Sequence, residues 1–136
     1  MSATLKKILI VDDNSAHLSL INSVLSNYYK VYPVDSGATA LKFLDKQMPD
    51  LILLDVEMPK MSGPELLQII KADARLSDVP VIFLTSNNDM ETEISVFKLG
   101  AADYIRKPVN DVIVLARVKA QLELAAYRKL GISIET

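Results

Sequence analysis

Short apolar runs alternate along this chain with stretches in which apolar residues recur at helical spacing. Runs of this length, bounded by polar and turn-forming residues, predict strands that are buried in a sheet. Strands that alternate with helices are typical of a parallel sheet built from βα units. The five expected strands cover residues 7–12, 30–34, 51–54, 79–85 and 103–106.

Helical signals occupy the segments between these runs. A first helix is expected over residues 15–27, where Leu18, Ile21 and Leu25 fall on one face. The second is expected to end at Gln47, before a proline. The residues expected to begin the later helices, as caps or in the first turn, are Ser36, Pro64, Asp89 and Asn110.

Strict alternation of five strands and five helices leaves few topologies, because crossovers between parallel strands are right-handed and both sheet faces need helices. We expect one α/β domain, a doubly wound three-layer sandwich of flavodoxin-like type with strand order 2-1-3-4-5. A barrel of eight βα units would need about 250 residues, and the chain has 136. The last helix, expected over 111–130, would be roughly 30 Å long and extend past the sheet. A helix that frays near Tyr127 is the alternative.

Composition narrows the function classes. The chain is 50% hydrophobic and 24% charged, with a formal net charge of −2, so it has no general basic field for nucleic acid or anionic lipid. It contains no cysteine, which excludes disulfides, thiolate metal sites and a cysteine nucleophile. The first apolar run, within residues 7–11, is ended by Asp12 after four apolar residues, too early for a signal peptide or a membrane span. We therefore expect a cytoplasmic protein that binds neither nucleic acid nor membrane.

Acidic residues follow two of the expected strands. Asp12 and Asp13 end the first run and Asp55 ends the third. If these strands are neighbours in a parallel sheet, their carboxyl ends meet at one edge and the three carboxylates converge. Like charges held this close raise one another's pKa, and a divalent cation such as Mg²⁺ or Mn²⁺ offsets that cost. The pattern therefore predicts a cation site.

Two further side chains fall at the same edge. Thr85 ends the fourth expected strand and Lys107 follows the fifth. Carboxylates, a hydroxyl and an ammonium around one crevice suit a phosphoryl group, which needs positioning and positive charge more than other protein chemistry. Asp55 stands alone at its strand end and is the candidate nucleophile, forming an acyl phosphate. Lys107 would pair with the carboxylate or the phosphate, and Thr85 would donate to a phosphate oxygen.

Four motifs in this order resemble the receiver domain of two-component response regulators, whose fold is that of the chemotaxis regulators. The resemblance covers about residues 7–124. Its motifs are Ile-Val-Asp-Asp-Asn at 10–14, Asp-Val-Glu-Met-Pro-Lys-Met-Ser-Gly at 55–63, Leu-Thr-Ser at 84–86 and Gly-Ala-Ala-Asp-Tyr-Ile-Arg-Lys-Pro at 100–108.

The resemblance implies that Asp55 accepts a phosphoryl group from a histidine kinase, a phosphotransfer protein or a small phosphodonor. It implies that Asp13 and Asp55 hold Mg²⁺ directly, Asp12 largely through water, and Glu57 through its backbone carbonyl. Thr85 and Tyr104 resemble the family's switch pair, which reorients on phosphorylation. A cis peptide bond is implied between Lys107 and Pro108.

A receiver of this kind is a signalling switch and not a turnover enzyme. Its partner-binding or dimerisation surface would lie on the fourth helix, fifth strand and last helix, and its partner would be an effector or an output domain. We expect the receiver over residues 1–124, and over 125–136 either a helix extension or the start of a linker to an output domain.

Two other functions compete with this interpretation. One is a Mg²⁺-dependent phosphatase with an aspartyl nucleophile, although Asp-x-Asp-x-Thr does not follow the first strand. The other is an unphosphorylated, receiver-like binding scaffold. His17, the only histidine, has no second histidine or cysteine with which to form a zinc site, and no role is assigned to it.

Overall fold

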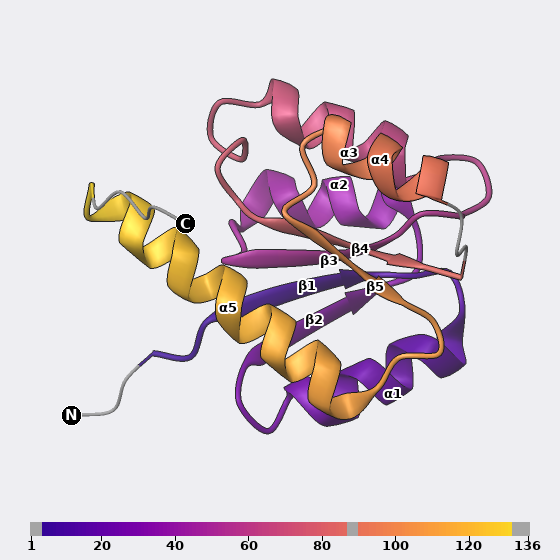
Figure 1. The fold of residues 1–136 in the computed structure, drawn as a ribbon, viewed down its shortest axis with the longest axis horizontal. Coiled ribbons are helices and arrows are strands. Elements are labelled where there is room, and N and C mark those ends of the chain that lie inside the picture. The colour runs from indigo at the N-terminus through magenta and orange to yellow at the C-terminus, as the bar shows by residue number, and fades with distance from the viewer. Residues whose placement is uncertain (1–3, 87–89, 132–136) are drawn as a thin grey trace.

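A computed structural model describes residues 4–86 and 90–131 of the chain. Strands and helices alternate throughout, as the apolar pattern predicts (Figure 1). The elements in chain order are β1 Lys7–Val11, α1 Ser15–Leu25, β2 Lys30–Val34, α2 Gly37–Lys46, β3 Leu51–Asp55, α3 Gly63–Ala72, β4 Val81–Thr85, α4 Met90–Lys98, β5 Asp103–Arg106 and α5 Asp111–Lys129.

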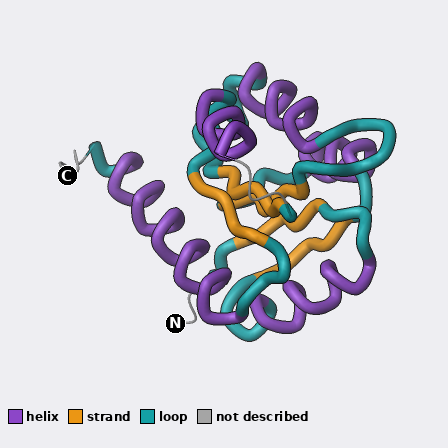
Figure 2. The backbone as a smooth tube through the Cα atoms, turned by 45° about the vertical axis from the view of Figure 1, so that its right-hand side comes forward, coloured by secondary structure: helices purple, strands orange, loops and turns teal. Residues whose placement is uncertain are grey.

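The five strands form one parallel sheet in the order β2-β1-β3-β4-β5. Figure 1 shows α1 and α5 on one face of this sheet and α2, α3 and α4 on the other, and Figure 2 shows the same layers from a second direction. The expected doubly wound sandwich and its strand order are confirmed. The chain reverses its winding direction between β1 and β3, and open α/β sheets bind ligands beyond the strand ends at such a switch point.

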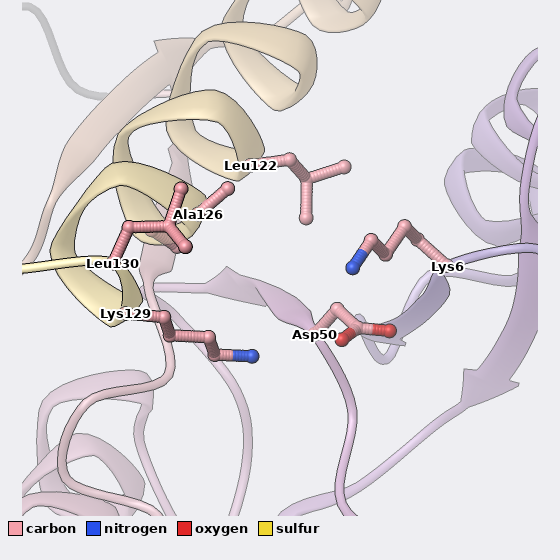
Figure 3. Close-up of a pocket in the computed structure, with 7 residues that line it drawn as sticks. Lys6, Asp50, Leu122, Ala126, Lys129 and Leu130 are labelled. Atoms are coloured by element: carbon pink, nitrogen blue, oxygen red, sulfur yellow. The ribbon is translucent and has the colours of Figure 1, made fainter.

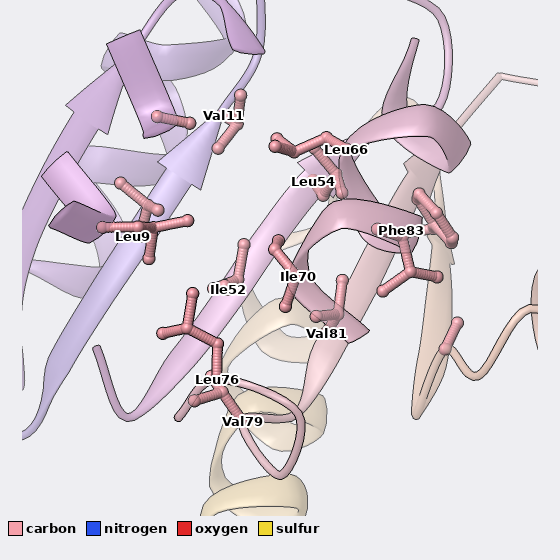
Figure 4. Close-up of a cluster of buried hydrophobic side chains, with 14 of the residues drawn as sticks. Leu9, Val11, Ile52, Leu54, Leu66, Ile70, Leu76, Val79, Val81 and Phe83 are labelled. Carbon is pink, nitrogen blue, oxygen red and sulfur yellow. The ribbon is translucent and has the colours of Figure 1, made fainter. Parts of the chain in front are cut away.

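Each face of the sheet carries its own apolar core, because successive side chains of a strand point to opposite faces. Ile8 and Ile10 pack beneath α1 and α5, whereas Leu9 and Val11 pack beneath α2 and α3. The second of these cores is shown in Figure 4, where Leu66 and Ile70 of α3 meet the central strands. Strands covered on both faces explain why β3 and β4 read as continuous apolar runs.

Some boundaries differ from the sequence-based expectation. β4 begins at Val81 and not at residue 79, because Pro80 has no N–H to donate to a ladder, although its carbonyl accepts from Ile52 at 3.0 Å. α1 ends at Leu25, two residues early, where Tyr28 and Tyr29 donate back to the Leu25 carbonyl in a turn. The expected cap at Asp89 lies outside the described residues.

Three of the expected helix starts are confirmed by their hydrogen bonds. Ser36 and Asn110 accept backbone N–H groups of the first turns of α2 and α5. At α3, Ser62 and Glu65 form a reciprocal capping box, with Pro64 in the first turn.

The last helix continues past Tyr127 to Lys129, so the longer of the two expected forms is present. Its distal turns leave the edge of the sheet (Figures 1 and 2), and Leu130 at its end is 73% exposed. The expected division at 124/125 falls within this continuous helix and stays a prediction. Within residues 4–86 and 90–131, no helix combines the length and apolar character needed to cross a membrane.

Candidate cation and phosphoryl site

Three carboxylates converge where β1 and β3 end. β1 pairs directly with β3, with Val11 opposite Leu54, so the residues after them share one edge of the sheet. Asp12, Asp13 and Asp55 each offer a carboxylate oxygen, and these atoms lie within 4.8 Å of one another. Asp12 is fully buried and Asp55 is 5% exposed, whereas Asp13 is exposed. Oxygen-only donor sets of this kind fit Mg²⁺ or Mn²⁺.

Lys107 also reaches this cluster. Its Nζ lies 3.0 Å from Asp12 Oδ2 and 3.3 Å from Asp55 Oδ1, and its side chain is 11% exposed. The residue follows β5, and its backbone N–H donates to the Thr85 carbonyl at 2.8 Å. The peptide bond to Pro108 is cis, as the family resemblance implies. One ammonium therefore balances only part of the charge of three carboxylates.

The pKa of the Asp55 carboxyl is raised from 3.8 to about 7. Burial is the largest cause, because it removes water from the charged form, and the like charge of Asp12 adds to it. The Lys107 ammonium acts in the opposite direction. Near neutral pH this carboxyl would thus be held between its two protonation states, and a cation would favour the carboxylate.

A cavity of about 560 Å³ opens over these groups. Thr85, at the end of β4, is 3% exposed and borders it, and Glu57 is exposed at its rim. The backbone N–H of Glu57 donates to Asp55 Oδ1 at 3.3 Å. The residues lining the cavity are Asp13, Asn14, His17, Asp55, Glu57, Thr85, Ser86, Lys107 and Pro108.

The loop between β3 and α3 depends on two backbone positions. At Gly63 a Cβ atom would lie 2.2 Å from the Asp55 carbonyl oxygen, so only glycine lets α3 begin directly beside the candidate nucleophile. Lys60 has a φ of +68°, in the left-handed region that a side chain disfavours. Gly63 belongs to one of the four sequence motifs, but its close approach to Asp55 depends on how α3 lies against β3.

His17 lies in the first turn of α1, inside the helix expected from the sequence, and it borders the cavity. Its Nδ1 lies 3.5 Å from Asp12 Oδ2. Among the described residues neither atom has a well-aligned hydrogen bond, so the contacts of Asp12 with His17 and Lys107 are electrostatic. Asn14 caps α1 by accepting from the His17 backbone N–H at 3.1 Å. That cap fixes His17 in the first turn of α1, beside the acids.

Tyr104 is the predicted switch residue that the structure does not bring to this cavity. It belongs to β5, and its ring lies 5.7 Å from the Phe97 ring of α4 in an edge-on arrangement. Its hydroxyl is hydrogen-bonded to Glu93 of α4. The other predicted site residues lie at the strand ends as expected, and Tyr104 packs against α4.

A second cavity, of about 290 Å³, lies at the opposite edge of the sheet beneath the distal half of α5 (Figure 3). The ammonium groups of Lys6 and Lys129 and the carboxylate of Asp50 face it from different elements, with Leu122 and Leu130 along one side. None of the predicted site residues borders this cavity, and its one carboxylate makes no cluster suited to a cation.

The family is shown by comparison with known proteins. The model of the response regulator receiver domain matches residues 8–119. The chain therefore belongs to the receiver domain family of two-component response regulators. Phosphorylation and Mg²⁺ binding at an acidic cluster are typical of this family, and its members interact with histidine kinases and output domains. The phosphatase alternative is not favoured.

Individual relatives agree with this assignment. A Vibrio cholerae protein named "Probable cyclic di-GMP phosphodiesterase" is 40% identical over 116 residues, 85% of this chain and 26% of that protein. The response regulator PleD of Caulobacter vibrioides is 36% identical over 115 residues, 84% of this chain and 25% of PleD. The receiver domain of a histidine kinase from Syntrophus aciditrophicus superposes with a TM-score of 0.79 at 35% identity, covering 87% of this chain and 90% of that one. The chain spans about a quarter of the length of these two curated relatives.

Proposed function

We propose that the chain is a phosphorylation switch in which Asp55 accepts the phosphoryl group. The observation that carries this proposal is the pairing of a 5% exposed Asp55 with Lys107 at 3.3 Å, inside a cluster of three acids. A carboxylate oxygen of Asp55 forms a bond to phosphorus while the bond from phosphorus to the donor breaks. The donor leaves as acetate from acetyl phosphate, or as the neutral imidazole of a kinase or phosphotransfer protein.

The cation that accompanies this reaction is Mg²⁺ or Mn²⁺, bound through Asp13 and Asp55, through Asp12 by way of water, and through the Glu57 carbonyl. The all-oxygen donors and the uncompensated negative charge of the cluster support this assignment. When bound, the cation supplies positive charge to the phosphoryl oxygens.

Two other side chains act on the phosphoryl group. Lys107 already lies among the carboxylates and offers its ammonium to a phosphoryl oxygen without a large movement. The Thr85 hydroxyl, at the border of the cavity, donates to a second oxygen. Neither role makes the chain a turnover enzyme, because the phosphoryl group stays on the protein until water removes it.

The output of the switch runs through Tyr104 to the surface formed by α4, β5 and α5. This surface binds an effector, an output domain or a second copy of the chain. Residues 1–124 act as the receiver, and the segment from 125 onward is either an extension of the last helix or the start of a linker to an output domain. We place the protein in the cytoplasm, where ATP-dependent histidine kinases and small acyl phosphates are available.

Mass spectrometry of the intact protein tests the phosphoacceptor directly. Wild type incubated with acetyl phosphate and Mg²⁺ should gain one alkali-labile phosphoryl group, and EDTA should prevent the gain. Asp55→Ala should gain none, whereas the matched control Asp45→Ala, which removes an exposed carboxylate from α2, should behave as wild type. An equal gain in Asp55→Ala would overturn the assignment, and steady turnover of a generic phosphate ester would favour the phosphatase alternative.

A further inference from the structure

Tyr104 is held against α4 by three side chains at once. The Glu93 carboxylate accepts a hydrogen bond from the Tyr104 hydroxyl. The same carboxylate forms an ion pair with the Arg106 guanidinium, which lies 6.0 Å from the centre of the Tyr104 ring. Phe97 contacts the ring edge-on, with the ring centroids 5.7 Å apart. The Glu93 carboxylate of α4 thus binds the Tyr104 hydroxyl and the Arg106 guanidinium, both of β5.

These contacts link an element near the cavity to the outer surface. β5 is an edge strand, and it pairs only with β4, where Tyr104 lies opposite Phe83 and Arg106 opposite Thr85. The Glu93 side chain is 23% exposed and the Arg106 side chain 50% exposed. The contact is therefore reachable by solvent and weak enough to break, because water screens such pairs.

We propose that Glu93 is a positioning residue that holds Tyr104 on α4 and thereby lowers the extent to which Asp55 is phosphorylated. The inference rests on the proposed function, in which Tyr104 turns inward when the phosphoryl group is attached. An inward turn requires the Tyr104 hydroxyl to leave Glu93. An interaction made in only one of two states shifts the equilibrium toward that state by its own strength.

The expected effect of releasing Tyr104 is modest. A hydrogen bond to a carboxylate is stronger than a neutral one, but exposure reduces the benefit of both the bond and the ion pair. Neutralising Glu93 should therefore raise the ratio of phosphorylated to unphosphorylated protein at fixed acetyl phosphate by roughly threefold to tenfold. Release would also take the Tyr104 ring from Phe97, which is already 46% exposed, and so change the apolar surface of α4.

The test compares wild type with Glu93→Gln and with Glu91→Gln, which removes the same charge from the same helix turn. Two quantities are measured in each protein: the phosphorylated fraction of Asp55 with acetyl phosphate and Mg²⁺, and the pKa of Tyr104 in the unphosphorylated protein from the NMR shift of a labelled tyrosine ring. Glu93 raises the pKa of Tyr104 through its hydrogen bond, so Glu93→Gln should lower that pKa. If Glu93 had only a structural role, a lower Tyr104 pKa would not be accompanied by more phosphorylation of Asp55.

The inference predicts that Glu93→Gln lowers the Tyr104 pKa and raises the phosphorylated fraction, while Glu91→Gln changes neither. It is overturned if the phosphorylated fraction of Glu93→Gln equals that of wild type, or if Glu91→Gln raises it equally. Absence of phosphorylation in wild type would instead refute the proposed function and the inference together. The two failures are therefore distinguishable.

Discussion

Replacement of Asp55 by asparagine should stabilise the cation-free protein at neutral and alkaline pH. The folded state raises the pKa of this carboxyl from 3.8 to about 7, so between these values the folded protein holds a proton that the unfolded chain has released. Stability is then fully present below the unfolded pKa and is lost as pH rises through the folded pKa. Each pKa unit corresponds to ~1.4 kcal/mol, which gives an upper limit of roughly 4 kcal/mol.

Relaxation of the charged site should reduce this limit, so we expect Asp55→Asn to exceed wild type by about 1–3 kcal/mol at pH 8 and to match it near pH 4. Urea unfolding in EDTA at several pH values, followed by circular dichroism, measures the difference. Groups that do not interact with Asp55 cancel in that difference, whereas Asp12 and Lys107, which do interact with it, contribute to the difference. A difference that does not change with pH, or an asparagine variant less stable than wild type at pH 8, would refute the reasoning. Added Mg²⁺ should stabilise wild type more than the variant.

Three further substitutions test the structure around Asp55. Gly63→Ala should lower the free energy of unfolding by about 2–4 kcal/mol in urea titrations, because its Cβ would meet the Asp55 carbonyl at 2.2 Å; an unchanged midpoint would contradict that close approach. Lys60→Gly should raise stability by about 0.5–1 kcal/mol, since φ is +68°, and a loss of stability would argue against left-handed backbone there. Lys107→Met should raise the Asp55 pKa above about 7, because the ammonium lowers it; carboxyl-carbon NMR would measure this, and a lower pKa would exclude the ion pair.

The arrangement of the sheet was predictable because its central strands are covered on both faces. β3 and β4 are buried at every position, so each appears in the sequence as an uninterrupted apolar run. The positions of Asp12, Asp13 and Asp55 followed from the same pattern, since parallel strands bring their carboxyl ends to one edge. The start of β4 was wrong by two residues because Pro80 interrupts the ladder in a run that is otherwise apolar.

The contacts between side chains of α4 and β5 were not predictable from spacing. Glu93 meets Tyr104 and Arg106 because α4 docks across β5 at a particular angle and height, and the periodicity of a helix does not determine either. The specific contact between His17 Nδ1 and Asp12 Oδ2 likewise depends on the side-chain conformations in the folded protein. The raised pKa of Asp55 depends on distances and burial, which appear only in the folded protein.

The central claim is that Asp55 carries the phosphoryl group. Borohydride reduces an acyl phosphate of aspartate to homoserine, so the reaction marks the acceptor permanently. Wild type treated with acetyl phosphate and Mg²⁺, then reduced, digested and sequenced by mass spectrometry, should contain homoserine at position 55 and nowhere else. Homoserine at Asp12 or Asp13, or its complete absence from position 55 in protein that has gained phosphate, would contradict the account.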